Sequence, residues 1–223
     1  MIITVGGIKG GSGKTTVATN LAVLRARAGR DVLLVDADDQ ETASDFTLLR
    51  NERLAGGAGF TSIKLTGAAV RNEVRRLAAK HDDVVIDTGG RDTTSQRAAL
   101  TVSEVVLVPF VPRSFDVWTL EKVSALIAEM RLANPSLRAH AFINRADPRG
   151  QDNAEAEAAI EEANELVLIR APLGTRKAFG NAAALGLSVV ELQPQDSKAS
   201  DEVMMLYRYL FDTALIPQTA AVA

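Results

Sequence analysis

The first 24 residues of the chain place a glycine-rich loop between an apolar run and a stretch with helical spacing. Residues 1–5 are apolar and largely β-branched, which predicts a short buried strand. Five of the eight residues in 6–13 are glycine, so few side chains keep a ligand away from the backbone. Lys14 and Thr15 follow and open the predicted helix. A strand, a glycine loop and a helix in this order surround phosphate groups with backbone N–H groups.

The residues of this loop have separate expected roles toward a phosphate. Lys14 carries a point charge suited to β- and γ-phosphates, and the hydroxyl of Thr15 is a ligand for Mg²⁺. The strict pattern G-x-x-x-x-G-K-[ST] is not met, because Ile8 stands five residues before Gly13. The residues expected to contact the nucleotide are Gly10, Gly11, Ser12, Gly13, Lys14, Thr15 and Thr16.

The segment Lys9-Gly10-Gly11-Ser12-Gly13-Lys14-Thr15 resembles the deviant Walker A box of the ParA/MinD family of ATPases. In that family an additional lysine near the start of the loop reaches across a dimer to the nucleotide of the other subunit. Lys9 is the matching residue here, and the resemblance implies a catalytic role for Lys9 together with Lys14. It also implies ATP and Mg²⁺ as cofactors and a homodimer that forms around ATP.

Acidic residues stand at the ends of two predicted strands. Asp87 follows a buried β-branched run, so its carboxylate needs a charged partner or a metal ion. This is the position of a Walker B aspartate, which is expected to hold Mg²⁺ directly or through water. Asp36 ends the strand predicted over 31–35 and is expected near the water shell of the same metal.

Two further segments resemble the switch loops of the same family. Residues 36–40, Asp-Ala-Asp-Asp-Gln, resemble switch I, usually Asp-x-Asp-Pro-Gln, which implies that Asp38 orients or activates the hydrolytic water. Asp39 replaces the usual proline, which leaves this loop less rigid. Residues 87–91, Asp-Thr-Gly-Gly-Arg, differ from the commoner Asp-x-Pro-Pro-Gly of switch II. The two glycines keep that loop able to sense a γ-phosphate through backbone N–H groups.

The segment Asn144-Arg145-Ala146-Asp147 follows a predicted strand and is similar to the Asn-Lys-x-Asp motif by which GTPases select guanine. In ParA-like proteins the matching asparagine instead contacts adenine. The resemblance therefore implies that Asn144 contacts the base and that ATP is the nucleotide, with Asp147 opening a turn at Pro148. GTP is the alternative at this point.

Strands alternate with helices along the chain, which predicts an α/β fold with a doubly wound, mostly parallel sheet and helices on both faces. No linker interrupts this pattern, so we expect a single P-loop ATPase domain over residues 1–223. Because the glycine loop begins so early, we expect no N-terminal helix-turn-helix.

Residues 41–60 are expected to form a mobile segment with at most one helix. Strands are predicted at 1–5, 31–35, 62–65, 84–86, 104–109, 138–144 and 167–169. Helices are predicted from 14 to near 29, at 68–80, 153–166, 176–185 and 200–215, and after 109 with Ser114 as its cap and Asp116 in its first turn.

The composition excludes several classes of protein. The chain has no cysteine, which excludes disulfides, thiolate zinc sites and iron–sulfur clusters. No apolar stretch reaches membrane-spanning length. In the tail, Val203, Leu206, Leu210 and Phe211 form an apolar stripe with Arg208 as its only basic neighbour, which favours docking on the core over lipid binding. We expect a cytoplasmic protein that binds no membrane.

The net charge of −3 argues against a uniformly basic nucleic-acid binder, so any contact with DNA needs a local patch. Arg170, Arg176 and Lys177 are the only charged residues between Leu166 and Val190. They match in position the late segment through which ParA-like proteins bind DNA nonspecifically, so the resemblance implies a salt-sensitive contact with phosphates there. The alternative is that these are solvated basic side chains at helix starts.

The resemblance as a whole implies a small ParA-type partition ATPase associated with the nucleoid. Its ATP dimer would bind DNA without sequence preference, and a ParB-like centromere-binding or cargo adaptor protein would stimulate slow hydrolysis. Two other hypotheses are left open. One is an ATP-dependent ligase or synthetase for a small molecule on the same fold, and the other is a nucleotide-gated positioning module with negligible turnover.

Overall fold

The structure, a computed structural model, describes residues 1–112, 117–149 and 151–212. The expected helix cap at Ser114 and Asp116 lies outside the described residues, as do residues 213–215 of the predicted tail helix. No helix in the described part of the chain combines the length and apolar character needed to cross a membrane.

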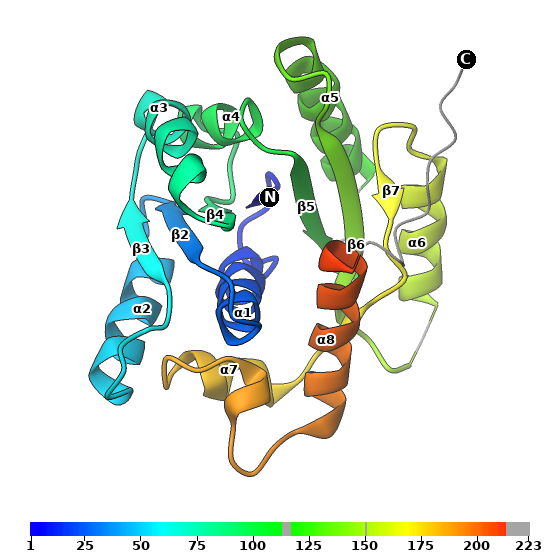
Figure 1. The fold of residues 1–223 in the computed structure, drawn as a ribbon. Helices are drawn as coiled ribbons and strands as arrows, with labels where there is room; N and C mark the ends of the chain where they lie inside the picture. The colour runs from blue at the N-terminus through cyan, green and yellow to red at the C-terminus, as the bar shows by residue number, and fades with distance from the viewer. Residues whose placement is uncertain (113–116, 150, 213–223) are drawn as a thin grey trace.

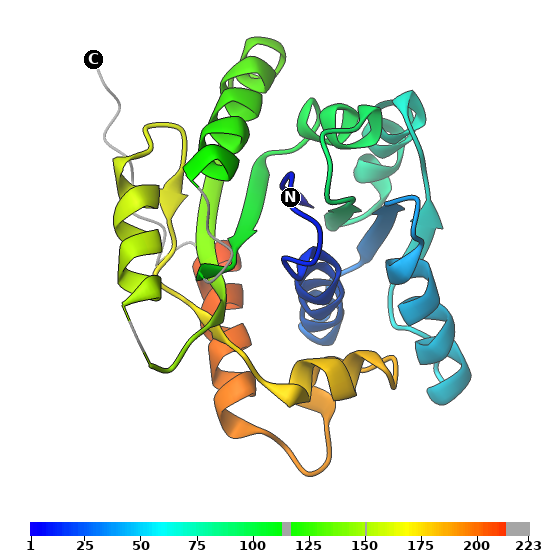
Figure 2. The same ribbon diagram turned by 180° about the vertical axis from the view of Figure 1, so that it is seen from behind.

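The sheet is parallel at every described strand pair, and its central strand carries the glycine loop. The strands are β1 (Ile2–Val5), β2 (Val32–Ala37), β3 (Thr61–Lys64), β4 (Asp83–Thr88), β5 (Val105–Phe110), β6 (Arg138–Ala146), β7 (Val167–Leu168) and β8 (Leu173–Gly174). Their order is β3-β2-β4-β1-β5-β6-β7, and β8 pairs with β6. The N-terminus therefore lies near the middle of the molecule in both ribbon views (Figures 1 and 2). The chain changes sides of β1 between β4 and β5, which makes the carboxyl end of β1 the expected ligand position.

Helices cover both faces of this sheet. On one face lie α1 (Lys14–Arg27), α7 (Lys177–Ala183) and α8 (Ser197–Phe211). On the other lie α3 (Ala68–Leu77) and α4 (Thr94–Leu100) over β2 and β4, and α5 (Val117–Ala133) and α6 (Asp152–Glu162) over β5 and β6. Helix α2 (Thr42–Arg53) contacts α1 and β3. Two short 3₁₀ turns, η1 (Ala78–Lys80) and η3 (Val189–Glu191), complete the described elements.

The pattern of burial explains this arrangement. All six residues of β2 are buried, with Val32 and Leu34 in the core under α1 and Leu33 and Val35 in the core under α3 and α4. Successive side chains point to opposite faces of a strand, so a strand covered on both sides is apolar along most of its length, and in β2 only Asp36 near its end is charged. The predicted α/β class with a parallel sheet is confirmed.

The structure differs from the predicted elements at several ends. Helix α4 is absent from the prediction, and α6 ends at Glu162 rather than at residue 166. Helix α8 begins at Ser197, where the Asp196 carboxylate accepts a hydrogen bond from the Ala199 N–H and caps it. Its apolar stripe is buried at Val203, Leu206 and Leu210, as predicted.

Candidate functional site

The loops at the carboxyl ends of β1, β2 and β4 surround a cleft of about 600 Å³. Its walls come from the glycine loop and the start of α1, from switch I (residues 36–40), from switch II (residues 87–91) and from the end of β6. The lining residues are Gly10, Gly11, Gly13, Lys14, Thr15, Thr16, Asp38, Asp39, Gln40, Thr42, Gly89, Gly90, Arg91, Thr93 and Arg145. Six of the seven residues predicted at 10–16 therefore line one cleft, all but Ser12, together with residues from three other parts of the sequence.

Two glycines around the cleft, Gly13 and Gly90, stand where a side chain would collide with a neighbouring segment. Gly13 has φ +89°, a left-handed conformation that side chains disfavour, and a Cβ there would lie 2.3 Å from Nδ2 of Asn144. At Gly90 of switch II, a Cβ would lie 2.5 Å from the Cα of Gly10. Switch II and the glycine loop thus pack backbone against backbone, which couples their positions.

Lys14 is buried inside the loop that it follows. Its ammonium group donates a hydrogen bond to the carbonyl oxygen of Lys9 at 2.9 Å, and the residue is 6% exposed. Burial lowers the pKa of this ammonium group, while the carboxylates of Asp87 and Asp38 raise it. The positive charge of Lys14 therefore lies close to the carboxylates of Asp87 and Asp38, in a buried place where its attraction to a phosphate would be strong.

Asp87 is the most constrained acid of the site. It is fully buried, and neither carboxylate oxygen has a hydrogen-bond partner in the described structure. Burial raises its pKa to about 7, with contributions from Asp36 and Asp38. The Thr15 hydroxyl, close by without completing a hydrogen bond of normal geometry, and the Lys14 ammonium group both lower it. Two unpartnered buried oxygens beside a threonine hydroxyl form a donor set that fits Mg²⁺.

Asp36 is different, because its oxygens already have partners. One oxygen accepts hydrogen bonds from the Ser44 N–H at 2.8 Å and the Ser44 hydroxyl at 2.7 Å, and the other accepts from the Asp38 N–H at 3.2 Å. Asp36 thereby fixes the start of α2 to the end of β2. This arrangement fits the water shell of a metal better than direct ligation. No group of three or more His, Cys, Asp or Glu among the described residues could hold a metal ion by itself.

The side chain of Asp38, in switch I, faces Gly89 of switch II. Its side chain is half-buried, and one carboxylate oxygen accepts a hydrogen bond from the Gln40 N–H at 3.3 Å. A Cβ at Gly89 would approach the same oxygen to 3.0 Å. Switch I and switch II therefore meet at this carboxylate, on the wall of the cleft.

Gln96 of α4 is a site residue that the sequence analysis misses. Its side-chain oxygen accepts hydrogen bonds from the Gly7 N–H and the Thr88 hydroxyl, both at 3.1 Å, and the residue is 1% exposed. Gln96 thus joins the glycine loop to the strand end that leads into switch II. The sequence carries a signal for it, because Thr93-Thr94-Ser95-Gln96 matches the capping-box pattern, and the Thr93 hydroxyl does accept from the Gln96 N–H.

A second cavity of about 310 Å³ adjoins the first. Both are lined by Gly13, Thr16 and Arg145, and the second extends along β8 and α7 to Lys177. Asn144 lines it and at the same time holds the glycine loop, since its Nδ2 donates to the Ser12 carbonyl at 2.6 Å. Predicted phosphate and base positions therefore lie in adjoining cavities.

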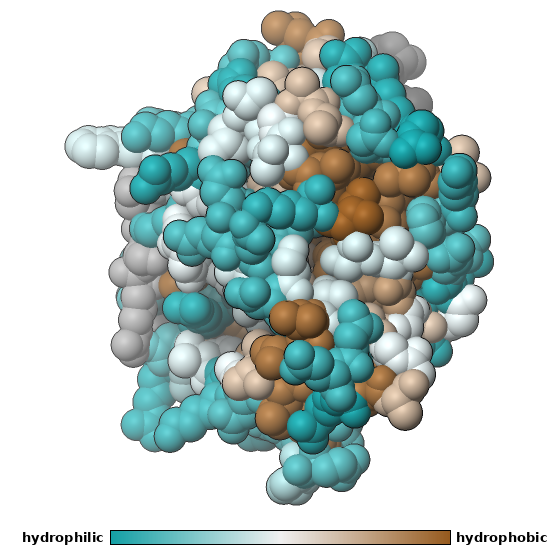
Figure 3. Space-filling view, turned by 90° about the vertical axis from the view of Figure 1, so that its left-hand side faces the viewer, coloured by the Kyte–Doolittle hydropathy of each residue, from teal (hydrophilic) through white to brown (hydrophobic). Residues whose placement is uncertain are grey.

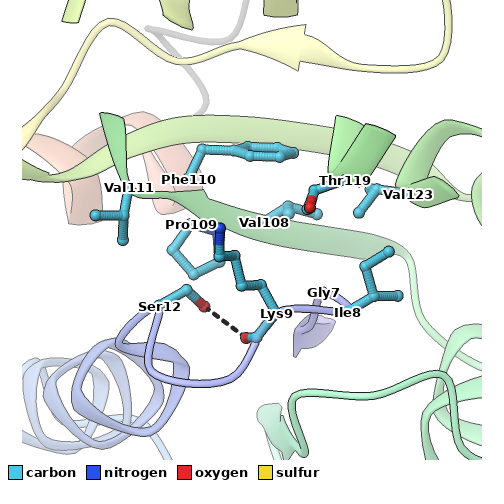
Figure 4. A pocket seen from close by; sticks show the side chains of 10 residues that line it. All are labelled: Gly7, Ile8, Lys9, Ser12, Val108, Pro109, Phe110, Val111, Thr119 and Val123. Carbon is cyan, nitrogen blue, oxygen red and sulfur yellow. Dashed lines mark hydrogen bonds between the residues drawn. The ribbon is translucent and has the colours of Figure 1, made fainter. Parts of the chain in front are cut away.

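Lys9 lies over β5 of its own chain (Figure 4). Its half-buried side chain runs along Pro109, in a small pocket that also includes Val111 and Thr119, and its carbonyl oxygen accepts a hydrogen bond from the Ser12 hydroxyl at 3.4 Å. A contact with the nucleotide of another subunit requires a different side-chain conformation.

The late basic residues are less available than the sequence suggests. Arg170 pairs with Glu157 and Glu161 of α6, and Arg176 pairs with Glu202 of α8. The segment has no acid of its own, but neighbouring helices bring acids to it. Lys177 at the start of α7 is exposed.

Comparisons with known proteins agree with this geometry. Residues 3–189 match the model of the CobQ/CobB/MinD/ParA nucleotide binding domain. The chain is 28% identical over 202 residues to the Maintenance of carboxysome distribution protein A of Halothiobacillus neapolitanus, covering 90% of this chain and 92% of that protein. It is 30% identical over 197 residues to the protein of the same name from Gloeobacter kilaueensis, covering 86% and 85%.

Among solved structures, a putative plasmid partition protein from Borrelia burgdorferi bound to AMPPNP superimposes with a TM-score of 0.73. It covers 94% of this chain and 98% of its own at 18% identity, which supports the fold alone. The family match spans the glycine loop, both switch loops and the end of β6. This chain belongs to the CobQ/CobB/MinD/ParA family of nucleotide-binding domains, in its small ParA-type form.

Proposed function

We propose that this protein is a ParA-type ATPase whose ATP-bound dimer binds DNA without sequence preference and positions a cargo. The observation that carries the proposal is the group at the carboxyl end of β1. There a buried lysine, Lys14, and a buried, unpartnered carboxyl, Asp87, flank the glycine loop. The first cavity takes the phosphates, and the second takes the ribose and base at Asn144.

The residues divide the work of phosphoryl transfer by position and charge. Backbone N–H groups of residues 10–16 surround the phosphates, and Lys14 neutralises their charge. Thr15 and Asp87 would hold Mg²⁺, with Asp36 near its water shell, and the metal would supply neutralisation of phosphate charge. Asp38 orients the attacking water between the two switch loops. Lys9 leaves its place over β5 and completes the site of the second subunit.

In this proposal, DNA binding is controlled by the equilibrium between monomer and dimer. Contacts of the γ-phosphate with switch I and switch II favour the dimer, and hydrolysis removes them. A ParB-like or other adaptor protein accelerates hydrolysis, which returns the monomer to the cytoplasm. ATP in place of GTP follows from the family resemblance at Asn144.

Two kinds of cargo are candidates, a DNA molecule and a carboxysome. Plasmid or chromosome partition fits the ParA-type fold, and carboxysome distribution is the function in the names of two relatives that cover most of this chain. Both use the same nucleotide chemistry and differ in the adaptor. The identity of the adaptor distinguishes them, through the protein that raises ATP turnover.

The first test is binding to random-sequence duplex DNA with ATP, ADP or no nucleotide, at two salt concentrations, beside Lys9→Ala. We expect binding only with ATP, weaker at the higher salt and lost in the variant. The dimer is measured in parallel by light scattering. No binding of the wild type under any condition would refute the DNA-bound dimer, and substrate-dependent phosphate release would then favour a small-molecule ligase.

A further inference from the structure

Helix α3 and the η1 turn that follows it form a basic surface of the chain. Residues 68–80 carry four cations and one acid, a net charge of +3 in a chain whose net charge is −3. The four cations are exposed, and they are Arg71, Arg75, Arg76 and Lys80. We call this the α3 surface.

Most of this charge is not neutralised. Glu73 pairs with Arg76, and the structure gives no ion pair among the described residues for Arg71, Arg75 or Lys80. Arg71 and Arg75 stand four residues apart and therefore point to the same side of the helix. The contrast with the late segment is clear, since Arg170 and Arg176 both have carboxylate partners.

The chemistry of the α3 surface fits a polyanion and not a lipid bilayer. Its apolar residues Val70 and Val74 face the core, and its exposed residues other than the cations are alanines and one asparagine, Asn72. Figure 3 looks onto the side of the molecule where α2 and α3 lie, and hydrophilic side chains predominate on it. A surface with cations and no large apolar side chain binds phosphates but does not insert into lipid.

The α3 surface is joined to the nucleotide site through α4. The Gly67 N–H at the start of α3 donates a hydrogen bond to the Ser95 hydroxyl at 2.8 Å. The next residue, Gln96, accepts hydrogen bonds from Gly7 of the glycine loop and from Thr88 at the entry to switch II. Two adjacent residues of one short helix, Ser95 and Gln96, therefore link the start of α3 to the glycine loop and to the entry of switch II.

We propose that the α3 surface, led by Arg71 and Arg75, is the surface through which this protein contacts the phosphate backbone of duplex DNA. The inference rests on the proposed function, because it names the residues of the DNA contact. It replaces Arg170 and Arg176, whose charges are already paired within the chain.

The test compares charge reversals at three places, using a random-sequence duplex with ATP. For the double variant Arg71→Glu and Arg75→Glu we expect affinity to fall about tenfold or more at low salt. The neutral double variant Arg71→Gln and Arg75→Gln is expected to reduce the slope of log affinity against log salt by about 2. Because both side chains are exposed, the melting temperature should stay within about 2 °C of wild type.

Two controls carry the same type of change elsewhere. Lys198→Glu with Arg208→Glu on α8 changes the net charge equally at exposed positions and is expected to leave DNA binding unchanged. Arg170→Glu tests the late segment and is expected to have little effect on affinity.

Each alternative result has a definite meaning. Wild-type binding that the α3 variants leave intact overturns this inference and leaves the proposed function standing, as does a loss confined to Arg170→Glu. Equal losses in the α8 control indicate net charge alone and also overturn it. No binding by the wild type refutes the proposed function and this inference together. Binding to phosphatidylglycerol vesicles but not to DNA, lost in the α3 variants, assigns the surface to a membrane instead.

Discussion

Asp87 combines full burial with two oxygens that lack partners, which is costly for an ionised carboxylate. The cost is visible in its pKa, which burial raises to about 7. A group whose pKa is higher in the folded than in the unfolded state binds its proton more tightly when folded. Its contribution to stability is therefore present at low pH and is lost as the pH rises through the unfolded value toward the folded one.

We expect Asp87→Asn to remove this pH dependence from the nucleotide-free protein. Between about pH 4 and pH 7 the wild type should lose stability relative to the variant by roughly 1.4 kcal/mol per pH unit, because only the wild type must release a proton to unfold. Denaturant unfolding of both proteins across this range measures the difference. A constant difference would show that Asp87 is ionised throughout, contrary to the raised pKa.

Gln96 permits a second prediction at the same scale. Gln96→Met keeps the volume but removes the acceptor for the Gly7 N–H and the Thr88 hydroxyl. The Thr88 hydroxyl can still donate to the Val5 carbonyl oxygen, but the Gly7 N–H is left without an acceptor. We therefore expect a loss of about 1–3 kcal/mol in stability, and weaker binding of ATP because the glycine loop is no longer held. Titration calorimetry with a non-hydrolysable ATP analogue measures the binding.

The matched control is Ser103→Ala. The Ser103 hydroxyl shares a buried hydrogen bond of 2.6 Å with Thr4 of β1, outside the loops of the cleft. This variant is expected to lose stability but to keep nucleotide affinity. Equal losses of affinity in both variants would mean that Gln96 acts through general stability.

Gly90 leads to a third prediction. A Cβ there would lie 2.5 Å from the backbone of Gly10, so Gly90→Ala must push switch II and the glycine loop apart. We expect ATP affinity to fall by about tenfold or more, since a 1.4 kcal/mol misfit alone gives that factor. Gly56→Ala, where no atom lies within 4 Å of the added carbon, should bind ATP as the wild type does. Unchanged binding by Gly90→Ala would show that the two loops are not packed together in solution.

The same residues show what sequence can reveal about the site. That Lys14, Thr15, Asp38 and Asp87 lie near one another was predictable, because a glycine loop and strand-end acids have a short, local pattern. The hydrogen bond from Asn144 to Ser12 was not, because the two residues are 132 positions apart and an asparagine after a strand has several possible partners.

At the scale of elements, α2 illustrates how a distant contact decides local structure. Its sequence has weak periodicity, yet Arg50 in its last turn is 4% exposed. The guanidinium donates hydrogen bonds to the carbonyl oxygens of Ala58 and Gly186 and pairs with Glu191 at 2.7 Å. Glu191 is 141 residues away, so no local pattern predicts that this helix is fixed.

We expect Arg50→Leu to destabilise the protein by roughly 3–5 kcal/mol, because it removes a buried partner of Glu191. Arg53→Leu, at an exposed position of the same turn, should change stability by about 0.5 kcal/mol or less. Urea unfolding measures both. If the pair carries the effect, adding Glu191→Leu to Arg50→Leu should recover part of the loss, and a loss no larger than that of Arg53→Leu would contradict the role of Arg50.

The start of α4 could have been predicted from the sequence, whereas for α6 the sequence indicates the helix but not where it ends. The capping-box pattern at residues 93–96 marks the start of α4, but its seven residues give too little periodicity for a helix to stand out. For α6 the run of acids continues past Glu162, although the helix ends there, because helix ends depend on the turn that follows more than on composition.

At the scale of the whole molecule, the charges are separated. The basic α3 surface lies near the β3 edge of the sheet, and the five acids of α6, with no basic residue among them, lie near the β7 edge (Figure 1). A net charge of −3 conceals this separation. A molecule with such a charge distribution approaches a polyanion with its basic edge first, which orients it before any specific contact forms.

The two cavities adjoin at three residues that line both of them, Gly13, Thr16 and Arg145. A ligand must therefore be long enough to occupy both compartments if it is to contact switch II and the base position together. In the proposed binding mode, a nucleoside monophosphate would leave the larger cavity empty, and free pyrophosphate would leave the smaller one empty. The two adjoining cavities would then select a ligand by the length of its phosphate chain.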